Sequence, residues 1–244
     1  MPRSFAREKR EKAIISFAMP NAALEPRASQ PPPHRPVVAE GVVLDARHAL
    51  VHAQHGWMAI ADVHFGYEAR RRRAGALLPD WGMPQCERVL HQLVQDHQPQ
   101  RLILVGDIMD GSGSVEETLE LLKRLTASVD VICVLGNHDR AGLRRGMSMT
   151  PSHREGEFLF EHGHLPLSDH EGVIVTGHEH PATNIRDGAG LRLKLPTMVQ
   201  EQLSAKTQRW ILPAFSPWAA GGEYRSAHQR LHTWVCAPGR VWRV

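Results

Sequence analysis

Five short apolar runs, each followed at once by polar side chains, constrain the fold of this chain more than any other feature. The runs are residues 57–61, 102–105, 131–135, 158–160 and 173–176. Near-continuous apolar runs of about 4 to 8 residues, rich in β-branched side chains, are typical of strands covered on both faces. In open α/β sheets, ligands collect beyond the carboxyl ends of such strands. The sequence therefore predicts an α/β fold whose functional side chains gather at one rim of a sheet.

The segments that follow these runs are rich in carboxylate, amide and imidazole groups. In chain order they are Asp62-Val63-His64, Gly106-Asp107-Ile108-Met109-Asp110, Gly136-Asn137-His138-Asp139, His162-Gly163-His164 and Gly177-His178-Glu179-His180. Each of these short motifs is weakly informative by itself. Five of them in this order, each after a predicted strand, indicate a hydrolytic site with two metal ions.

We assign the predicted ligands to two cations. Asp62 and His64 alternate by two along an extended segment, so both side chains can face the same cation. His180 completes this first set. Asp107 follows a glycine that permits close approach of the backbone, and it is best placed to bridge the two cations, which a shared carboxylate holds ~3.5 to 4 Å apart. The second set is completed by Asn137, His162 and His178.

The ligand types restrict the choice of metal. Mixed nitrogen and oxygen ligands suit transition metals better than magnesium or calcium. We therefore expect two divalent transition-metal ions, with manganese first and iron or zinc as alternatives. Two such cations lower the pKa of a bridging water and polarise a phosphoryl group, so the predicted reaction is attack of a hydroxide on phosphorus.

Two further side chains are predicted to act in catalysis. If side chains alternate after the third run, His138 points away from Asn137 and is free to reach the substrate. Asp139 could hydrogen-bond the His138 ring and favour its charged form, which would stabilise developing negative charge or protonate the leaving oxygen. Asp110, three residues after the bridging carboxylate, is expected behind the ligands rather than on the metal.

Helical patterns alternate with the predicted strands. Residues 84–98 and 114–128 each place apolar side chains on one face, as expected of helices that cover a sheet. Ser114 and Glu117 have the spacing of a capping box at the start of the second helix. From Leu191 onward the pattern changes to strands and loops, which indicates a second sheet.

The chain divides into two regions by composition. Residues 1–36 contain several prolines and are expected to be a disordered or extended lead, whereas residues 37–244 form the catalytic domain. The lead has seven Lys or Arg and three Glu, a net charge of +4, which leaves −1 of the total of +3 for the rest. The domain is therefore not a nucleic-acid-binding domain by bulk charge alone.

Composition also bears on location. The three cysteines, Cys86, Cys133 and Cys236, are odd in number and scattered, which favours a reducing compartment over a disulfide framework. The apolar segment 13–19 is at the lower length limit for a secretory signal, and no apolar run approaches the ~20 residues of a membrane span. We expect a cytoplasmic protein with no membrane partner.

Several arginines allow two interpretations. The run Arg70-Arg71-Arg72-Arg73 follows a predicted metal-ligand loop and is either a solvated helix face or a phosphate-facing surface. Arg140, just after the third motif, could contact a second phosphate group or remain solvated. The sequence leaves both alternatives open.

The ordered motifs resemble those of the calcineurin-like metallophosphoesterase superfamily. The resemblance extends from about residue 40 to the C-terminus, includes every motif, and implies a four-layer α/β/β/α sandwich. It also implies that His162 rather than His164 is a ligand, with His164 near the phosphate or behind the ligands. Within the superfamily, three features resemble the bacterial DNA-ligase-associated phosphoesterases and their archaeal relatives: Asp62-Val63-His64-Phe65-Gly66, the stretch 193–196, and residues 212–215 followed by Gly221-Gly222.

Three functions follow from these predictions. The first is a metal-dependent phosphoesterase, more specifically a phosphodiesterase, acting on a nucleotide or nucleic acid and associated with DNA-repair enzymes. The second is a DNA nuclease of repair, with the arginine run guiding a strand. The third is an interaction module that keeps the fold without the chemistry, although such modules typically lose a ligand or the catalytic histidine, and none is missing here.

Overall fold

A computed structural model describes residues 35–186 and 188–244 of the chain. The first sheet has six strands in sequential order: β1 (Val37–Ala39), β2 (Val42–Asp45), β3 (Ala49–His52), β4 (Trp57–Ile60), β5 (Arg101–Val105) and β6 (Asp130–Val134). The first four strands form an antiparallel meander, and β4, β5 and β6 are parallel. Of the predicted lead, only residues 35 and 36 lie within the described part.

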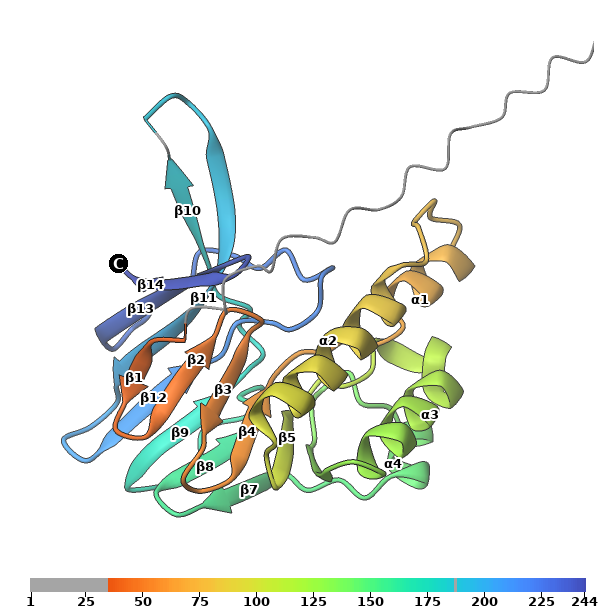
Figure 1. Cartoon of the computed structure of the whole chain (residues 1–244), viewed down its shortest axis with the longest axis horizontal. Helices are drawn as coiled ribbons and strands as arrows, with labels where there is room; N and C mark the ends of the chain where they lie inside the picture. The colour runs from red at the N-terminus through yellow and green to blue at the C-terminus, as the bar shows by residue number, and fades with distance from the viewer. Residues whose placement is uncertain (1–34, 187) are drawn as a thin grey trace, which may run out of the picture. The chain divides into compact units, whose positions relative to one another are not determined.

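The second sheet has eight strands and is mixed. They are β7 (Ser152–Glu155), β8 (Phe158–Glu161), β9 (Gly172–Thr176), β10 (Ala182–Arg186), β11 (Arg192–Gln202), β12 (Thr207–Ile211), β13 (Gln229–Ala237) and β14 (Arg240–Arg243). Their order is β14-β13-β11-β12-β9-β8-β7, and β10 pairs with β11 in a hairpin that projects from the sheet (Figure 1). The parallel pairs β8–β9 and β9–β12 bring the ends of β8 and β9 to one rim.

The described residues form four α-helices and one short 3₁₀ helix. They are α1 (Tyr67–Arg73), α2 (Gly82–His97), the 3₁₀ helix (Gly111–Ser114), α3 (Val115–Thr126) and α4 (Ala141–Gly146). The two helices predicted from the apolar pattern are confirmed with slightly different ends. The predicted capping box is not formed, because the Ser114 hydroxyl donates to the Phe65 carbonyl instead.

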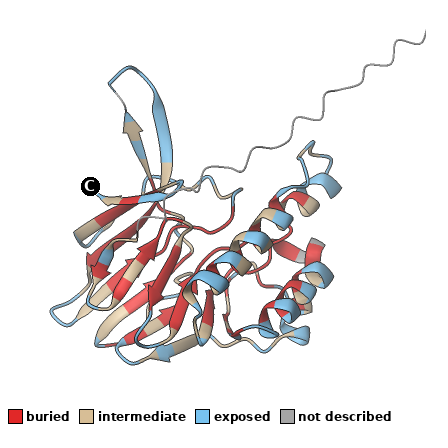
Figure 2. Ribbon diagram, viewed as in Figure 1, coloured by how far each residue is buried: buried red, intermediate tan, exposed pale blue. Residues whose placement is uncertain are grey.

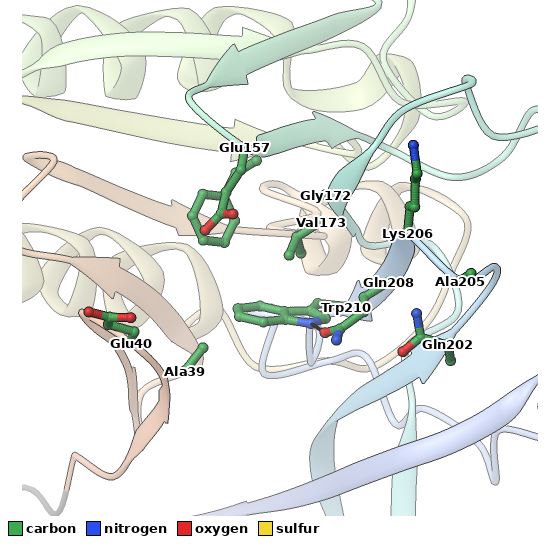
Figure 3. A pocket seen from close by; sticks show the side chains of 11 residues that line it. Ala39, Glu40, Glu157, Gly172, Val173, Gln202, Ala205, Lys206, Gln208 and Trp210 are labelled. Atoms are coloured by element: carbon green, nitrogen blue, oxygen red, sulfur yellow. Dashed lines mark hydrogen bonds between the residues drawn. The ribbon is translucent and has the colours of Figure 1, made fainter.

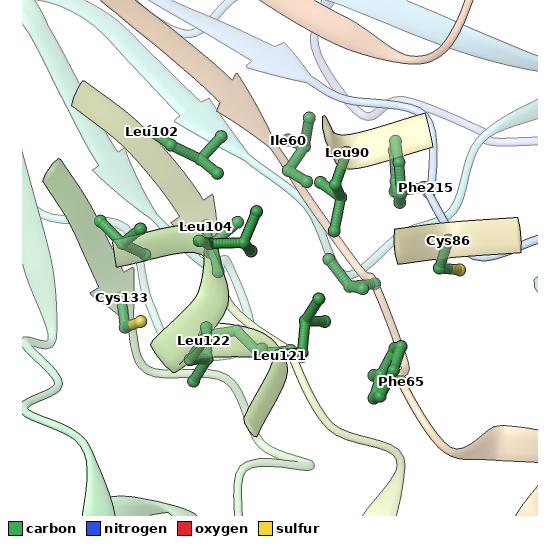
Figure 4. Packing of buried hydrophobic residues seen from close by; sticks show 14 of the residues in the cluster. Ile60, Phe65, Cys86, Leu90, Leu102, Leu104, Leu121, Leu122, Cys133 and Phe215 are labelled. Atoms are coloured by element: carbon green, nitrogen blue, oxygen red, sulfur yellow. The ribbon is translucent and has the colours of Figure 1, made fainter. Parts of the chain in front are cut away.

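Two hydrophobic clusters hold the layers together. One lies between the first sheet and its helices and includes Ile60, Leu104, Leu90 and Leu122 (Figure 4). The other lies between the two sheets and is rich in aromatic side chains, such as Trp57, Phe160 and Trp210. Figure 2 shows the buried residues concentrated along both sheets and on one side of each long helix.

The predicted α/β sandwich with a second sheet is confirmed. Its helices cover the first sheet, and within residues 35–186 and 188–244 no helix follows Gly146, so the second helical layer of the expected four-layer arrangement is not found there. The long connection after β12 is rich in proline and glycine, at Pro213, Pro217, Gly221 and Gly222. Both residue types disfavour a helix interior.

Candidate metal centre

The five predicted motifs meet at one rim of the sandwich. The first three follow β4, β5 and β6 of the first sheet, and the last two follow β8 and β9 of the second. Backbone hydrogen bonds join neighbouring motifs: the His64 amide donates to the Asp107 carbonyl at 2.9 Å, and the Gly177 amide to the His162 carbonyl at 3.2 Å. Ligands from distant parts of the chain are thereby fixed in one cluster.

The first predicted ligand set is assembled as expected. Asp62, His64 and His180 each offer one atom to a group whose atoms lie within 4.8 Å of one another. The His180 Nε2 atom lies 3.3 Å from Asp62 Oδ1 and 3.3 Å from His64 Nε2. This spacing is suited to a cation that would be held by one carboxylate and two imidazoles.

The second predicted set lies beside the first. Asp107, His162 and His178 form another group of candidate ligands within 4.8 Å. The His162 Nε2 atom lies 3.1 Å from Asn137 Oδ1 and 3.2 Å from Asp107 Oδ2. The same Asp107 oxygen is 3.9 Å from His64 Nε2, so Asp107 lies between the two sets, as a bridging carboxylate must.

The orientation of His162 bears on what the second set could bind. Its Nδ1 atom donates to the Val105 carbonyl at 3.1 Å, which turns Nε2 toward Asn137 and Asp107. Burial works against a charged ring, but the Asp107 carboxylate raises the pKa of His162, so this position favours positive charge, which a proton or a metal ion can supply. The donor set therefore fits a divalent metal. His164, whose pKa is lowered by burial and by the neighbouring His162 and His178, has no comparable contact with the carboxylates.

Hydrogen bonding also sets the charge of the predicted bridge. Burial alone would raise the pKa of Asp107, but the hydrogen bond and charge interaction with His162, the His138 amide and the nearby His64 together outweigh it and lower the pKa to about 2. The other carboxylate oxygen accepts the His138 amide at 2.8 Å. The Asp107 carboxylate is therefore ionised near neutral pH and held in a fixed orientation.

The backbone is left-handed at five of the predicted ligands. The φ angles are positive at Asp62, His64, Asp107, His178 and His180, between 44° and 70°. Such angles are uncommon outside glycine and cost energy that the surrounding structure must offset. Their concentration at one rim indicates that interactions which hold these side chains in position offset the cost of the unfavourable backbone angles.

Two glycines permit the close approach of these segments. A Cβ atom at Gly106 would lie 2.3 Å from the His162 ring, and one at Gly177 would lie 2.6 Å from the Asp62 carboxylate. Neither neighbour can move without displacing a candidate ligand. These positions therefore need glycine for space, and Gly106 also for its φ of 74°.

The residues behind the ligands are only partly as predicted. Asp110 lies where it was expected: its Oδ1 atom is 3.6 Å from His64 Nδ1 and 3.4 Å from His138 Nδ1. Its other oxygen accepts a 2.7 Å hydrogen bond from Arg70 Nε. Asp110 thus orients a ligand and the predicted catalytic histidine together.

The predicted partnership of Asp139 with His138 is wrong. The buried Asp139 carboxylate accepts hydrogen bonds from the backbone amides of Ile108, Met109 and Gly136, at 2.8 to 3.1 Å. These bonds fasten the loop after β5 to the loop after β6. Burial raises the pKa of Asp139, and its function in this arrangement is to hold the loops together.

The arginine run divides between two environments. Arg70 contacts Asp110 beside the ligands, whereas Arg72 and Arg73 lie near surface carboxylates, 3.6 Å from Asp80 and 3.9 Å from Glu117. The solvated interpretation is thus favoured for the later arginines and the site-facing one for Arg70. Arg140 is exposed at the start of α4 and has no described contact with the ligand cluster.

An open pocket of about 240 Å³ adjoins the first ligand set. It is lined by His64, His138, His180, Asp110, Arg70, Tyr67, Ser216, Trp218 and Ala219. The last four were not predicted as site residues. Residues 214–216 reach the site because the Ser216 amide donates to the Asp62 carbonyl, a tertiary contact with no signature in the local sequence.

A larger pocket lies elsewhere. It has a volume of about 410 Å³ and is lined by Glu40, Glu157, Lys206 and Trp210 among others (Figure 3). None of the predicted ligands is among its lining residues. Metal-dependent chemistry is therefore assigned to the histidine-rich rim.

Comparison with known proteins agrees with this geometry. A family model described as calcineurin-like phosphoesterase matches residues 58–241. Separately, none of the described helices has the length and apolar character needed to cross a membrane. A nuclease MPE from Pseudomonas putida is 24% identical with a TM-score of 0.63, and the alignment covers 83% of this chain and 94% of that chain. Yfce, a phosphoesterase from E. coli, is 19% identical with a TM-score of 0.43, covering 77% and 97%. No curated protein sequence matches the chain.

At 24% identity and a TM-score of 0.63, the Pseudomonas putida structure supports the fold alone. The family model, by contrast, spans most of the sequence and includes every predicted motif. The resemblance inferred from those motifs is confirmed: the chain belongs to the calcineurin-like phosphoesterase family.

Proposed function

We propose that the chain is a phosphodiesterase with two metal ions at the rim cluster. The observation that carries the proposal is the position of Asp107 between two separate groups of candidate ligands, 3.9 Å from His64 and 3.2 Å from His162. One group would hold the first cation with Asp62, and the other would hold the second with Asn137. Manganese is the proposed metal, because both groups combine imidazole and oxygen donors.

The side chains around the metals have distinct proposed tasks. Bound cations would supply charge neutralisation and an acidified water. His138 lines the pocket with its Nδ1 atom held toward Asp110, so its other nitrogen is available to donate a proton to the leaving oxygen. Asp110 would keep that ring oriented, and Arg70 would keep Asp110 oriented.

The charge of the pocket favours a diester over a monoester. Of the nine residues that line it, Arg70 is the one Lys or Arg, and its Nε atom is engaged by Asp110. A monoester dianion gains more from additional cationic groups than a diester monoanion does. The substrate proposed is therefore a phosphodiester with a single negative charge at the reacting phosphate.

A nuclease is the second candidate function. The similar structure from Pseudomonas putida is described as a nuclease, and Arg70, Arg71, Arg72 and Arg73 lie on one short helix that begins next to the pocket. Phosphate contacts by such residues predict cleavage of DNA that weakens steeply with salt. Salt-insensitive cleavage of small diesters, with no action on DNA, would exclude this function. Association with DNA-repair enzymes and a cytoplasmic location stay predictions.

The direct test is Asp107→Asn assayed with a chromogenic phosphodiester and added Mn²⁺. We expect turnover to fall by at least about 100-fold, beyond the 10- to 100-fold typical of residues behind the ligands. Asp130→Asn is the matched control, since Asp130 is exposed at the opposite end of β6. Unchanged turnover in the Asp107 variant, or full activity with a chelator present, would overturn the two-metal proposal. Absence of metal-dependent turnover in the wild type would instead favour the interaction module.

A further inference from the structure

Three aromatic side chains form a ladder beside the pocket. The rings of Tyr67 and Trp218 are stacked with centroids 6.0 Å apart and an interplanar angle of 19°. Trp81 continues the series, with its centroid 4.8 Å from that of Trp218. The three residues come from the start of α1, the loop after β12 and the residue before α2, so the ladder is a product of the tertiary fold.

The ladder adjoins the candidate metal ligands. Tyr67 and Trp218 line the same pocket as His64, His138 and His180. Trp218 follows Ser216 by two residues, and the Ser216 amide is bonded to the carbonyl of Asp62. A substrate whose phosphate lay on the ligands would therefore have its neighbouring groups next to these rings.

The ladder is not part of the hydrophobic core. Neither of the two buried clusters includes any of its three residues, and Trp81 is 46% exposed. Large aromatic side chains at the surface lose apolar burial, so they are informative when they gather at a functional rim. Packing within the described core does not account for their position.

The central ring is held rigidly. Trp218 Nε1 donates to Glu68 Oε2 at 2.9 Å, and the other oxygen of Glu68 accepts the Met83 amide at the start of α2. Glu68 itself is 1% exposed. A ring fixed in this way before binding loses little freedom when a ligand stacks on it.

Positive charge flanks the ladder. The guanidinium carbons of Arg70 and Arg71 lie 6.0 Å and 5.7 Å from the Tyr67 ring centroid. Aromatic faces combined with arginines are the means by which proteins bind single-stranded nucleic acids, because every base has a stacking face and every linkage has a phosphate. A base inside a duplex already stacks on its neighbours and would first have to leave them.

We infer that Tyr67, Trp218 and Trp81 form a subsite for an unpaired base of the nucleotide next to the phosphate that is cleaved. The inference rests on the proposed function and adds to it a requirement for a base at a defined place in the substrate. Stacking acts on the bound substrate before and during the reaction alike. Its loss therefore raises KM and leaves kcat nearly unchanged.

The test compares two single-stranded oligonucleotides with Mn²⁺, one unmodified and one with abasic residues throughout a central segment. For the wild type, we expect the unmodified strand to be cut within that segment with a KM about 5- to 100-fold lower than the abasic strand. Trp218→Leu should raise KM for the unmodified strand toward the abasic value while leaving the abasic strand unaffected. A duplex of the same sequence should be cut more slowly than the single strand.

Two further variants distinguish loss of base stacking from a general disturbance of the fold. Trp81→Ala alters an exposed ring that makes no hydrogen bond to Glu68, and it should raise KM for the unmodified strand about 2- to 10-fold. Trp242→Ala, on β14, is the matched control and should change nothing.

Three results would overturn the base subsite: equal KM for the two strands in the wild type, equal losses on both strands in Trp218→Leu, or faster cleavage of the duplex. Absence of metal-dependent cleavage of either strand, and of the chromogenic diester, would instead contradict the proposed function itself.

Discussion

Two buried clusters of charged and histidine side chains in this molecule are compensated in opposite ways. At the end of β2, the fully buried Asp45 accepts hydrogen bonds from Arg47 Nε at 2.9 Å and Arg35 Nε at 3.0 Å, and it contacts His97 Nε2 at 2.9 Å. At the rim of the candidate metal centre, the oxygens of Asp107 and Asn137 instead face the Nε2 atom of His162. The Asp45 cluster contains its own positively charged partners, whereas the rim cluster brings the oxygen atoms of Asp107 and Asn137 together around one histidine.

Amino-acid composition alone does not distinguish these two clusters. Both clusters combine aspartate with histidine, but burying a charge is tolerable only when a partner offsets it. Although burial works against it, hydrogen bonds from Arg47 and His97 hold the pKa of Asp45 well below its usual range. The Asp45 cluster therefore ties β2 to the end of α2, whereas the rim cluster is a candidate metal site.

The largest effect on the free energy of unfolding is expected from replacing Asp45. Asp45→Asn leaves Arg47 and His97 without their buried counter-charge, and we expect the free energy of unfolding to fall by about 3 kcal/mol. Urea unfolding followed by circular dichroism measures this loss. Activity at 25 °C should persist, and a stability equal to that of the wild type would show that the cluster is not structural.

A slightly smaller change in the free energy of unfolding is expected when Mn²⁺ binds to the rim cluster. Mn²⁺ at 100 times its dissociation constant should raise the free energy of unfolding by about 2.7 kcal/mol, because it binds the folded state alone. Asp62→Asn should remove most of this gain, whereas Asp45→Asn should retain it. Equal stabilisation of Asp62→Asn and the wild type by Mn²⁺ in thermal unfolding would contradict the proposed role of Asp62 as a metal ligand.

The smallest effect concerns acid. The pKa of Asp45 is lowered in the folded state, so its contribution is present above the unfolded value of about 3.9 and is lost as pH falls toward the folded value. Below about pH 3.9 the wild type should lose this advantage over Asp45→Asn by about 1.4 kcal/mol per pH unit. Unfolding curves of the two proteins that stay parallel from pH 6 to pH 2.5 would contradict the assignment.

The sequence predicted the candidate site residues that directly follow a strand. Apolar runs locate β4, β5, β6, β8 and β9, and residues directly after a strand can hardly avoid the rim. Asp62, Asp107 and His162 were therefore predictable as neighbours. The outer layer was less predictable. Among the described residues no helix follows Gly146, and long loops take its place, with paths that are set by tertiary contacts.

Sequence reasoning failed where two segments compete for one hydrogen-bonding group. Asp139 is adjacent to His138 in sequence, but its carboxylate is taken by amides of the loop after β5, and Asp110 supplies the contact to His138 instead. Similarly, Ser114 bonds to Phe65 rather than capping its own helix. The position of Trp218 was not predictable, because it depends on a hydrogen bond to Glu68, which lies 150 residues away in the sequence.

The division of the candidate ligands between the two sheets has a mechanical consequence. Asp62 and Asp107 are anchored to the first sheet, and His162 and His178 to the second, so bound cations would join the two sheets at their rim. Any sliding of one sheet across the other would then stretch bonds to metal. The aromatic packing between the sheets around Trp57 and Phe160 would then act as a spacer that keeps the two halves of the proposed site at a fixed separation.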